Sequence, residues 1–248
     1  MKIMNRSVLI ALVLAGNVSA ATVEEWIVAG DAAIAGFNLD KASLAYKRAL
    51  KLDSKNYEAC WRLARTTVDQ GILEADNSKK RLLYLEAQEY ARGAVRLNPK
   101  GSKGHAFLAV VVGQLALYEG GRTKVELSKE VRTESEKAIA IAPKEDLAYH
   151  VLGVWNREMV GLNWFLRKFA ETLYGAFPPA SMDDAIRHLR RAAELAPSIV
   201  PHQVELGITL IAAGKKDEAR TILEHALTMP KTWVTDDVYK QKARAALH

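Results

Sequence analysis

Apolar side chains recur at helical spacing along the chain, in segments that each end at a turn signal. One kind of segment recurs along the chain and contains small residues. Each copy ends at Asp-Ser, Asn-Pro, Ala-Pro or Met-Pro. Proline ends a helix because it lacks an N–H donor. The copies occupy residues 45–56, 89–101, 134–146, 188–200 and 222–231. A second apolar segment opens each unit, at residues 24–34, 58–68, 104–114, 147–157 and 202–212. The pattern predicts about five pairs of helices.

Small residues recur at one position in each set of segments. In the first segments this position holds Gly30, Ala64, Ala109, Gly153 and Gly207. In the second segments it holds Ala49, Ala94, Ala138, Ala192 and Ala226. A larger side chain at either position would push two crossing helices apart. We therefore expect the two helices of each unit to cross here.

Spacing and residue type together resemble the tetratricopeptide-repeat (TPR) superfamily over about residues 23–231. The last unit fits the 34-residue pattern through Leu206, Gly207, Ala219, Ala226 and Pro230. The first fits through Trp26, Gly30, Ala42, Tyr46 and Ala49, with Ser54 in the proline position. The resemblance implies an all-α fold, a right-handed α-α superhelix whose first helices line a concave face. Helix pairs of this kind gain stability by stacking on their neighbours.

We divide the chain into a leader (1–20), a TPR solenoid (21–231) and a C-terminal capping helix (234–248). The repeats are expected at about 23–56, 57–101, 102–145, 146–199 and 200–233. The middle repeats carry extra helical length around 71–86 and 118–130, and the fourth carries the largest insertion, 160–182. Thr235 is the expected N-cap of the last helix, and acidic residues follow it in the first turn.

Residues 1–20 have the pattern of a secretory signal peptide. Lys2 and Arg6 precede an apolar run, Val8 to Gly16, and Val18-Ser19-Ala20 supplies small residues for cleavage. The run is shorter than the ~20 residues that a membrane-spanning helix needs. We expect cleavage after Ala20 and export, most simply to a bacterial periplasm. The alternative is that the leader is retained as a short membrane anchor.

Composition narrows the possible functions. The net charge is +6, or +4 without the two basic leader residues, and no basic stripe with interleaved aromatic residues appears, so we expect no nucleic-acid partner. One cysteine excludes an intrachain disulfide framework and any multi-cysteine metal site. The six histidines are not spaced as a ligand set. We therefore expect no metal and no cofactor.

A narrower resemblance covers about residues 57–230. The sequence at 149–197 is similar to the regulator of microtubule dynamics family, whose pattern combines H-x-L-G-x-W, a tryptophan-containing amphipathic helix, a glycine, a proline pair and an acidic helix start. The matching residues are His150, Leu152, Gly153, Trp155, Trp164, Gly175, Pro178, Pro179, Asp183 and Asp184. Segments 60–65 and 126–143 also fit. The resemblance implies an atypical TPR module, which in eukaryotic members serves organelle contact, interaction with membrane-anchored proteins and phospholipid binding. An exported relative would not meet microtubules, so that activity does not carry over.

The repeat frame places seven candidate binding residues of the first helices on the concave face. They are Trp61, Arg65, Asp69, Gln114, His150, Arg157 and Glu158. Arg65 and Arg157 are suited to hold a carboxylate or phosphate in bidentate fashion, and Trp61 offers an apolar platform. The alternative is structural: Arg157 pairs with a neighbouring acid, and Trp61 fills the space between two repeats.

The insertion in the fourth repeat has one apolar side. Leu162, Phe165, Leu166, Phe169 and Leu173 fall at helical spacing, opposite Arg167, Lys168 and Glu171. One interpretation is an amphipathic flap that closes over the groove or touches lipid. The interpretation we favour is a helix that packs its apolar side on the solenoid. As contact residues of the insertion we name Trp164, Tyr174 and Phe177.

No catalytic motif of the metalloprotease, P-loop, serine-hydrolase or dinucleotide-binding type occurs in the chain. We therefore expect a non-enzymatic interaction module of the cell envelope that binds a protein partner or peptide segment in its concave groove. The alternative is a protein that binds phospholipid or another amphiphile through the groove and the aromatic insertion 160–180, and a membrane surface is a further possible partner.

Overall fold

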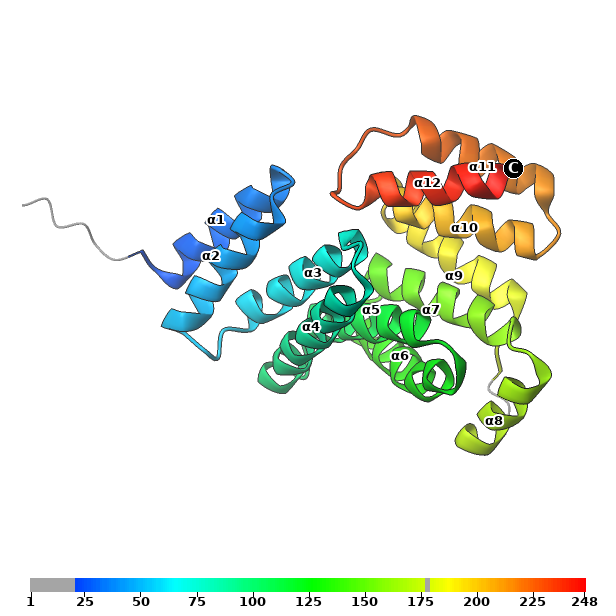
Figure 1. The fold of residues 1–248 in the computed structure, drawn as a ribbon, viewed down its shortest axis with the longest axis horizontal. Helices are drawn as coiled ribbons and strands as arrows, with labels where there is room; N and C mark the ends of the chain where they lie inside the picture. Colours follow the sequence, from blue (N-terminus) through cyan, green and yellow to red (C-terminus); the bar gives the residue numbers. More distant parts are fainter. Residues whose placement is uncertain (1–20, 177–178) are drawn as a thin grey trace, which may run out of the picture.

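The computed structural model describes residues 21–176 and 179–248, so the predicted leader and Phe177 lie outside the described residues. The described residues form twelve α-helices and no strand (Figure 1). The helices are α1 (Val23–Ala35), α2 (Leu39–Leu52), α3 (Tyr57–Leu73), α4 (Asn77–Leu97), α5 (Ser102–Glu119), α6 (Gly121–Ile141), α7 (Asp146–Val160), α8 (Trp164–Tyr174), α9 (Met182–Leu195), α10 (Val200–Ala212), α11 (Lys216–Thr228) and α12 (Asp236–Leu247). The most extensive contacts join α1 to α2, α3 to α4, α5 to α6, α7 to α9 and α10 to α11.

Local sequence signals set where these helices begin and end. Thr22 and Glu25 form a capping box at α1, and each satisfies a backbone N–H of the other. The Asn56 side chain caps α3 in the same way by accepting from Ala59 N at 2.9 Å. As predicted from the prolines, α4 ends before Asn98-Pro99 and α6 ends before Ala142-Pro143.

The helices of each pair cross closely at the glycines that the sequence singled out. A Cβ atom on Gly30 would overlap the Tyr46 ring, and one on Gly207 would lie 2.5 Å from Leu223. On Gly153 it would lie 2.6 Å from Leu189. Separations this short force a side chain or a helix to move. The prediction that only small residues fit these three crossings is confirmed.

Helix α8 packs on the outside of the solenoid against α6. Leu162, Leu166, Phe169 and Leu173 pack against the large central cluster of buried side chains, so the packing interpretation of this insertion is confirmed. Phe165 was wrongly placed on this buried side, since it is 52% exposed. It lies in the first turn of α8, where the Arg122 guanidinium lies 5.1 Å from its ring centroid.

The segment between α11 and α12 connects the last repeat directly to the first two, which the sequence pattern did not predict. Helix α12 packs on α10 and α11, as expected of a cap. The loop before it extends toward the N-terminal helices (Figure 1). There the Trp233 indole donates from Nε1 to Asp69 Oδ2 of α3 at 2.9 Å, and Lys231 lies 5.4 Å from the Phe37 ring centroid. We call residues 229–236 the closing loop.

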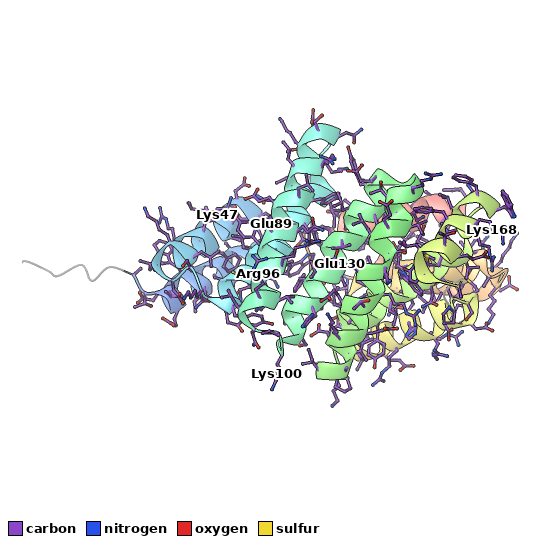
Figure 2. The ribbon with its side chains drawn as sticks, turned by 90° about the horizontal axis from the view of Figure 1, so that it is seen from below. Lys47, Glu89, Arg96, Lys100, Glu130 and Lys168 are labelled. Carbon is purple, nitrogen blue, oxygen red and sulfur yellow. The ribbon has the colours of Figure 1, made fainter. Side chains whose placement is uncertain are left out.

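The outer face of the solenoid carries charges of both signs (Figure 2). Pairs link successive repeats across it: Lys47 Nζ lies 3.0 Å from Glu86 Oε1, and Arg92 Nη2 lies 3.1 Å from Glu130 Oε2. These pairs are partly exposed, and each contributes little to stability. None of the helices that the structure describes is both long enough and apolar enough to cross a bilayer.

Candidate functional site

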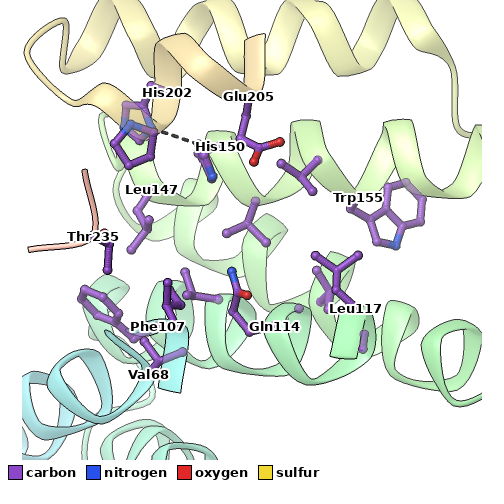
Figure 3. A pocket seen from close by; sticks show the side chains of 18 of the residues that line it. Val68, Phe107, Gln114, Leu117, Leu147, His150, Trp155, His202, Glu205 and Thr235 are labelled. Carbon is purple, nitrogen blue, oxygen red and sulfur yellow. Dashed lines mark hydrogen bonds between the residues drawn. The ribbon is translucent and has the colours of Figure 1, made fainter. Parts of the chain in front are cut away.

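The concave side of the solenoid contains a cavity of about 440 Å³ (Figure 3). Its lining comes mainly from α3, α5, α7 and α10, the first helices of four repeats, with further residues from α6, α12 and the closing loop. Cavities of this size are typical of small-molecule sites. The superhelix therefore brings residues that lie far apart in the sequence to one place.

One wall of the cavity is apolar and is built on α5. Phe107, Val110, Gly113 and Leu117 line it, and their spacing of three and four residues places them on one side of the helix. Further apolar lining residues come from α3, α6 and α7: Val68, Ile72, Val131, Val151, Val154, Trp155 and Met159. We call the α5 row the apolar wall.

The opposite wall is polar and is built on α7 and α10. Arg157 Nη1 donates to Glu205 Oε2 at 2.8 Å and to Thr209 Oγ1 at 3.1 Å, and Glu158 lies beside the same guanidinium. The Glu205 side chain is only 7% exposed. Although burial lowers the pKa of Arg157, the carboxylates of Glu205 and Glu158 raise it above its ordinary value. A charged pair therefore holds α7 to α10.

Two histidines and an aspartate form a chain in the same wall. His202 Nε2 lies 2.9 Å from Asp146 Oδ2, and His202 Nδ1 lies 3.0 Å from His150 Nδ1. Burial lowers the pKa of His150 well below its ordinary value, and the nearby Arg157 guanidinium lowers it further. Burial raises the pKa of Asp146, but the hydrogen bond from His202 and the nearby positive charge of Lys103 act with the other lowering contacts to bring that pKa below its ordinary value. We call Asp146, His202 and His150 the histidine chain.

A third polar group lies where the closing loop meets α3. Burial raises the pKa of Asp69 to about 7, while the Trp233 hydrogen bond acts in the opposite direction. The Arg65 guanidinium lies 4.8 Å from the Trp233 ring centroid and 5.5 Å from that of Trp61. The Arg65 Nε atom is buried without a hydrogen-bond partner among the described residues, and no ion pair joins Arg65 to a described carboxylate.

The structure brings six of the seven concave-face candidates together around this cavity. They are Arg65, Asp69, Gln114, His150, Arg157 and Glu158. The seventh, Trp61, lies behind the lining, where its ring stacks on Phe107 at 5.5 Å and its Nε1 donates to Glu58. Trp61 thus fills the space between two repeats, and Arg157 pairs with acidic residues. Both observations agree with the structural role that the sequence offered as the alternative to ligand binding.

Of the named insertion residues that the structure describes, neither Trp164 nor Tyr174 lines the cavity. Trp164 is 74% exposed in the first turn of α8, and Tyr174 hydrogen bonds to Ser128 of α6 at 2.7 Å. Phe177 lies outside the described residues.

Sequence reasoning missed the cavity residues contributed by α10, the closing loop and α12. These include His202, Glu205, Trp233 and Tyr239. His202 and Glu205 lie in the recognised first-helix segment 202–212. Polar side chains in this otherwise apolar segment could have indicated that both residues line the concave side. Trp233 gave no such signal, because nothing local shows that the loop reaches a residue 164 positions earlier in the chain.

Within residues 21–176 and 179–248, no three His, Cys, Asp or Glu side chains are grouped so that they could hold a metal ion. Cys60 is buried, and burial raises the pKa of its thiol above the ordinary value. A buried thiol of this kind behaves as a small apolar side chain.

Known proteins resemble the chain in sequence and in fold. Regulator of microtubule dynamics protein 1 of Bos taurus is 29% identical over 147 residues, which are 59% of this chain and 46% of the relative. Protein 3 of Mus musculus is 28% identical over 182 residues, 73% of this chain and 39% of the relative. The chain thus spans about half or less of the length of these relatives.

The structure of a thermophilic TPR protein from Thermus thermophilus superimposes with a TM-score of 0.66 at 19% identity, covering 91% of this chain and 99% of that one. This likeness shows that the fold is an α-α superhelix of the TPR type. The sequence profile described as regulator of microtubule dynamics protein 1-3 matches residues 27–248. The chain therefore belongs to the regulator of microtubule dynamics family.

Proposed function

We propose that this protein is a non-catalytic binding protein that holds a small amphiphilic molecule in the cavity between the apolar wall and the polar wall. The observation that carries the proposal is the opposition of these walls across about 440 Å³. An apolar chain would lie against Phe107, Val110 and Leu117, where it removes apolar surface from water. A polar group at its end would face α7 and α10.

The polar wall supports binding better than catalysis. Its charged groups satisfy one another, since Glu205 accepts from both Arg157 and Lys242 and Glu158 accepts from Lys124. A general acid or base has to be within reach of a reacting group and free to exchange a proton with it. TPR folds serve as interaction modules, which agrees with a binding role.

Gly113 offers a direct test of the cavity. A Cβ atom there would have only Val131 Cγ2 as a neighbour, at 4.0 Å, so Gly113→Leu would fill the cavity without displacing a helix. Native mass spectrometry of wild-type protein from its own host should show a bound small amphiphile, which the Gly113→Leu variant should lack. Gly93→Leu is the matched control, because Gly93 lies on α4 outside the cavity. A ligand-free wild-type mass, or equal retention by Gly113→Leu, would contradict the proposal.

We place this activity in the cell envelope, on the basis of the leader at residues 1–20. The mature chain would begin at Ala21. Fractionation of the source cell, with intact-mass measurement of the purified protein, tests this. Recovery in the cytoplasm with the leader attached would contradict export.

A second candidate, a protein partner that inserts a segment or chain terminus into the concave side, is favoured by Arg65. Its guanidinium lies near two indole rings without a carboxylate partner among the described residues, which suits a carboxylate of a bound peptide. Cross-linking in cells should capture a protein that is lost in Arg65→Met and kept in Arg96→Met, since Arg96 is exposed outside the cavity. Identical captures by both variants would remove this candidate.

A further inference from the structure

Two hydrogen-bonding groups face each other across the cavity without a described protein partner. The Gln114 side chain extends from the apolar wall toward His150 (Figure 3). No hydrogen bond joins the Gln114 amide to a described residue, and the His150 ring is bonded only through Nδ1, to His202. His150 is 9% exposed and lines the cavity, and its Nε2 has no protein partner among the described residues. Both groups are open to the cavity, where a ligand can bond to them in place of water.

The histidine chain determines what His150 Nε2 can bond. The ionised Asp146 carboxylate only accepts, so His202 carries its proton on Nε2 and donates it to Asp146 at 2.9 Å. When each ring carries one proton, His202 Nδ1 is an acceptor, and His150 Nδ1 donates to it across the 3.0 Å between them. In this state His150 Nε2 has a free lone pair, so it accepts from a hydrogen-bond donor in the cavity.

The cations that line the cavity leave little positive charge for an acidic ligand. Each lining lysine, and Arg157, already has a carboxylate partner. The pairs are Lys103 with Glu145, Lys124 with Glu158, Arg157 with Glu205 and Lys242 with Glu205. Among the described residues that line the cavity, Arg65 is the remaining cation, and it lies on α3 against the closing loop. An anionic group beside His150 would therefore lie next to a nitrogen that accepts hydrogen bonds, and the nearby cations would already be paired with carboxylates.

We propose that the cavity selects an uncharged amphiphile with an alcohol group at the end of its apolar chain, an inference that rests on the proposed function. The alcohol O–H donates to His150 Nε2, and the alcohol oxygen accepts from the Gln114 amide N–H. A carboxylate of the same chain length has no proton to donate and loses hydration that the site does not replace. The apolar chain lies along Leu117 and Trp155, away from the histidine chain (Figure 3).

Isothermal titration of the full chain at pH 8 with 1-decanol and with decanoate tests this, because the two probes share one chain length. We expect 1-decanol to bind about 10-fold tighter or better. Gln114→Leu should weaken 1-decanol about 5-fold and leave decanoate unchanged. His150→Phe should abolish the preference. His188→Phe is the control, because His188 stacks on Tyr149 outside the cavity.

The outcomes separate this inference from the proposed function. If decanoate binds as tightly as 1-decanol or tighter, the cavity binds amphiphiles but the alcohol assignment is wrong. If decanoate binding is lost in Arg65→Met, the headgroup lies at Arg65 instead. If neither probe binds, the proposed function fails as well. An unchanged preference in the folded Gln114→Leu and His150→Phe variants would also overturn the assignment.

Discussion

The two walls of the cavity are built by different means. The apolar wall comes from one helix, α5, whose side chains follow the helical period. The polar wall joins α7 to α10, and its bonds cross about 50 sequence positions, as from Arg157 to Glu205 and from His150 to His202. A local pattern can thus define the shape of a cavity, whereas its chemistry depends on which repeats meet.

The largest effect is expected in the polar wall, from Arg157→Leu. This change leaves the buried Glu205 carboxylate without its main partner, and Lys242 at 3.4 Å replaces it poorly. Breaking a buried pair in this way costs about 3–5 kcal/mol. Urea denaturation measures the loss of unfolding free energy.

The double variant Arg157→Met with Glu205→Met is the control for that experiment. Replacing both partners removes the unpaired charge, so most of the stability should return. A double variant as unstable as Arg157→Leu would show that packing, not the charge pair, holds these helices together.

In the apolar wall, Phe107→Ala is expected to cost about 3 kcal/mol, because it removes a buried ring that stacks on Trp61 at 5.5 Å. Phe107→Leu keeps most of the apolar volume and should cost less than about 1.5 kcal/mol. Thermal and urea unfolding of both variants measures this. Equal losses would mean that this wall depends on the aromatic ring and not on its volume.

The sequence predicted the fold because the information is local. The small residues at helix crossings, such as Gly153 and Gly207, and the proline stops define pairs of helices of known geometry. The same frame placed Gln114 and His150 on the concave side. It did not predict the partners of His150, because they lie on another repeat and depend on the superhelical rise between repeats.

The closing loop shows the same limit more strongly. The segment that contains Trp233 reads as a connection to a capping helix, yet the Trp233 indole bonds to Asp69 in the second repeat. The prediction that Phe165 is buried was wrong for a related reason. Helical spacing indicates which side of a helix a residue lies on, but not where the neighbouring helix that covers this side ends.

Asp69 and His150 should give stability opposite dependences on pH. The folded pKa of Asp69 is raised to about 7, so the fold holds a proton there that the unfolded chain has released, and stability falls as pH rises toward 7. Between pH 5 and pH 8 this amounts to about 2–3 kcal/mol. The pKa of His150 is lowered, so its contribution to stability is lost as pH falls below about 6.5.

Urea denaturation of wild type and Asp69→Asn at pH 5 and pH 8 isolates the first effect. The stability of the wild type relative to Asp69→Asn should decrease from pH 5 to pH 8. In Asp69→Asn only the opposite trend from His150 should remain. An identical pH dependence in both proteins would place Asp69 in contact with water.

The smallest effect is expected from Trp233→Phe in the closing loop. It removes the N–H that donates to Asp69 Oδ2 and keeps an aromatic ring near Arg65, so we expect a loss of about 1 kcal/mol. Trp26→Phe is the matched control, since the Trp26 ring lies under Arg48 on α1 and α2. Hydrogen exchange of the α3 amides should increase in Trp233→Phe alone.

A crystal structure of the protein purified without detergent from its own host tests the central claim most directly. We predict electron density for an elongated molecule between the apolar wall and the polar wall, with its polar end beside His150 and Gln114. Ordered water alone in this space, or side chains that close it, would contradict the account.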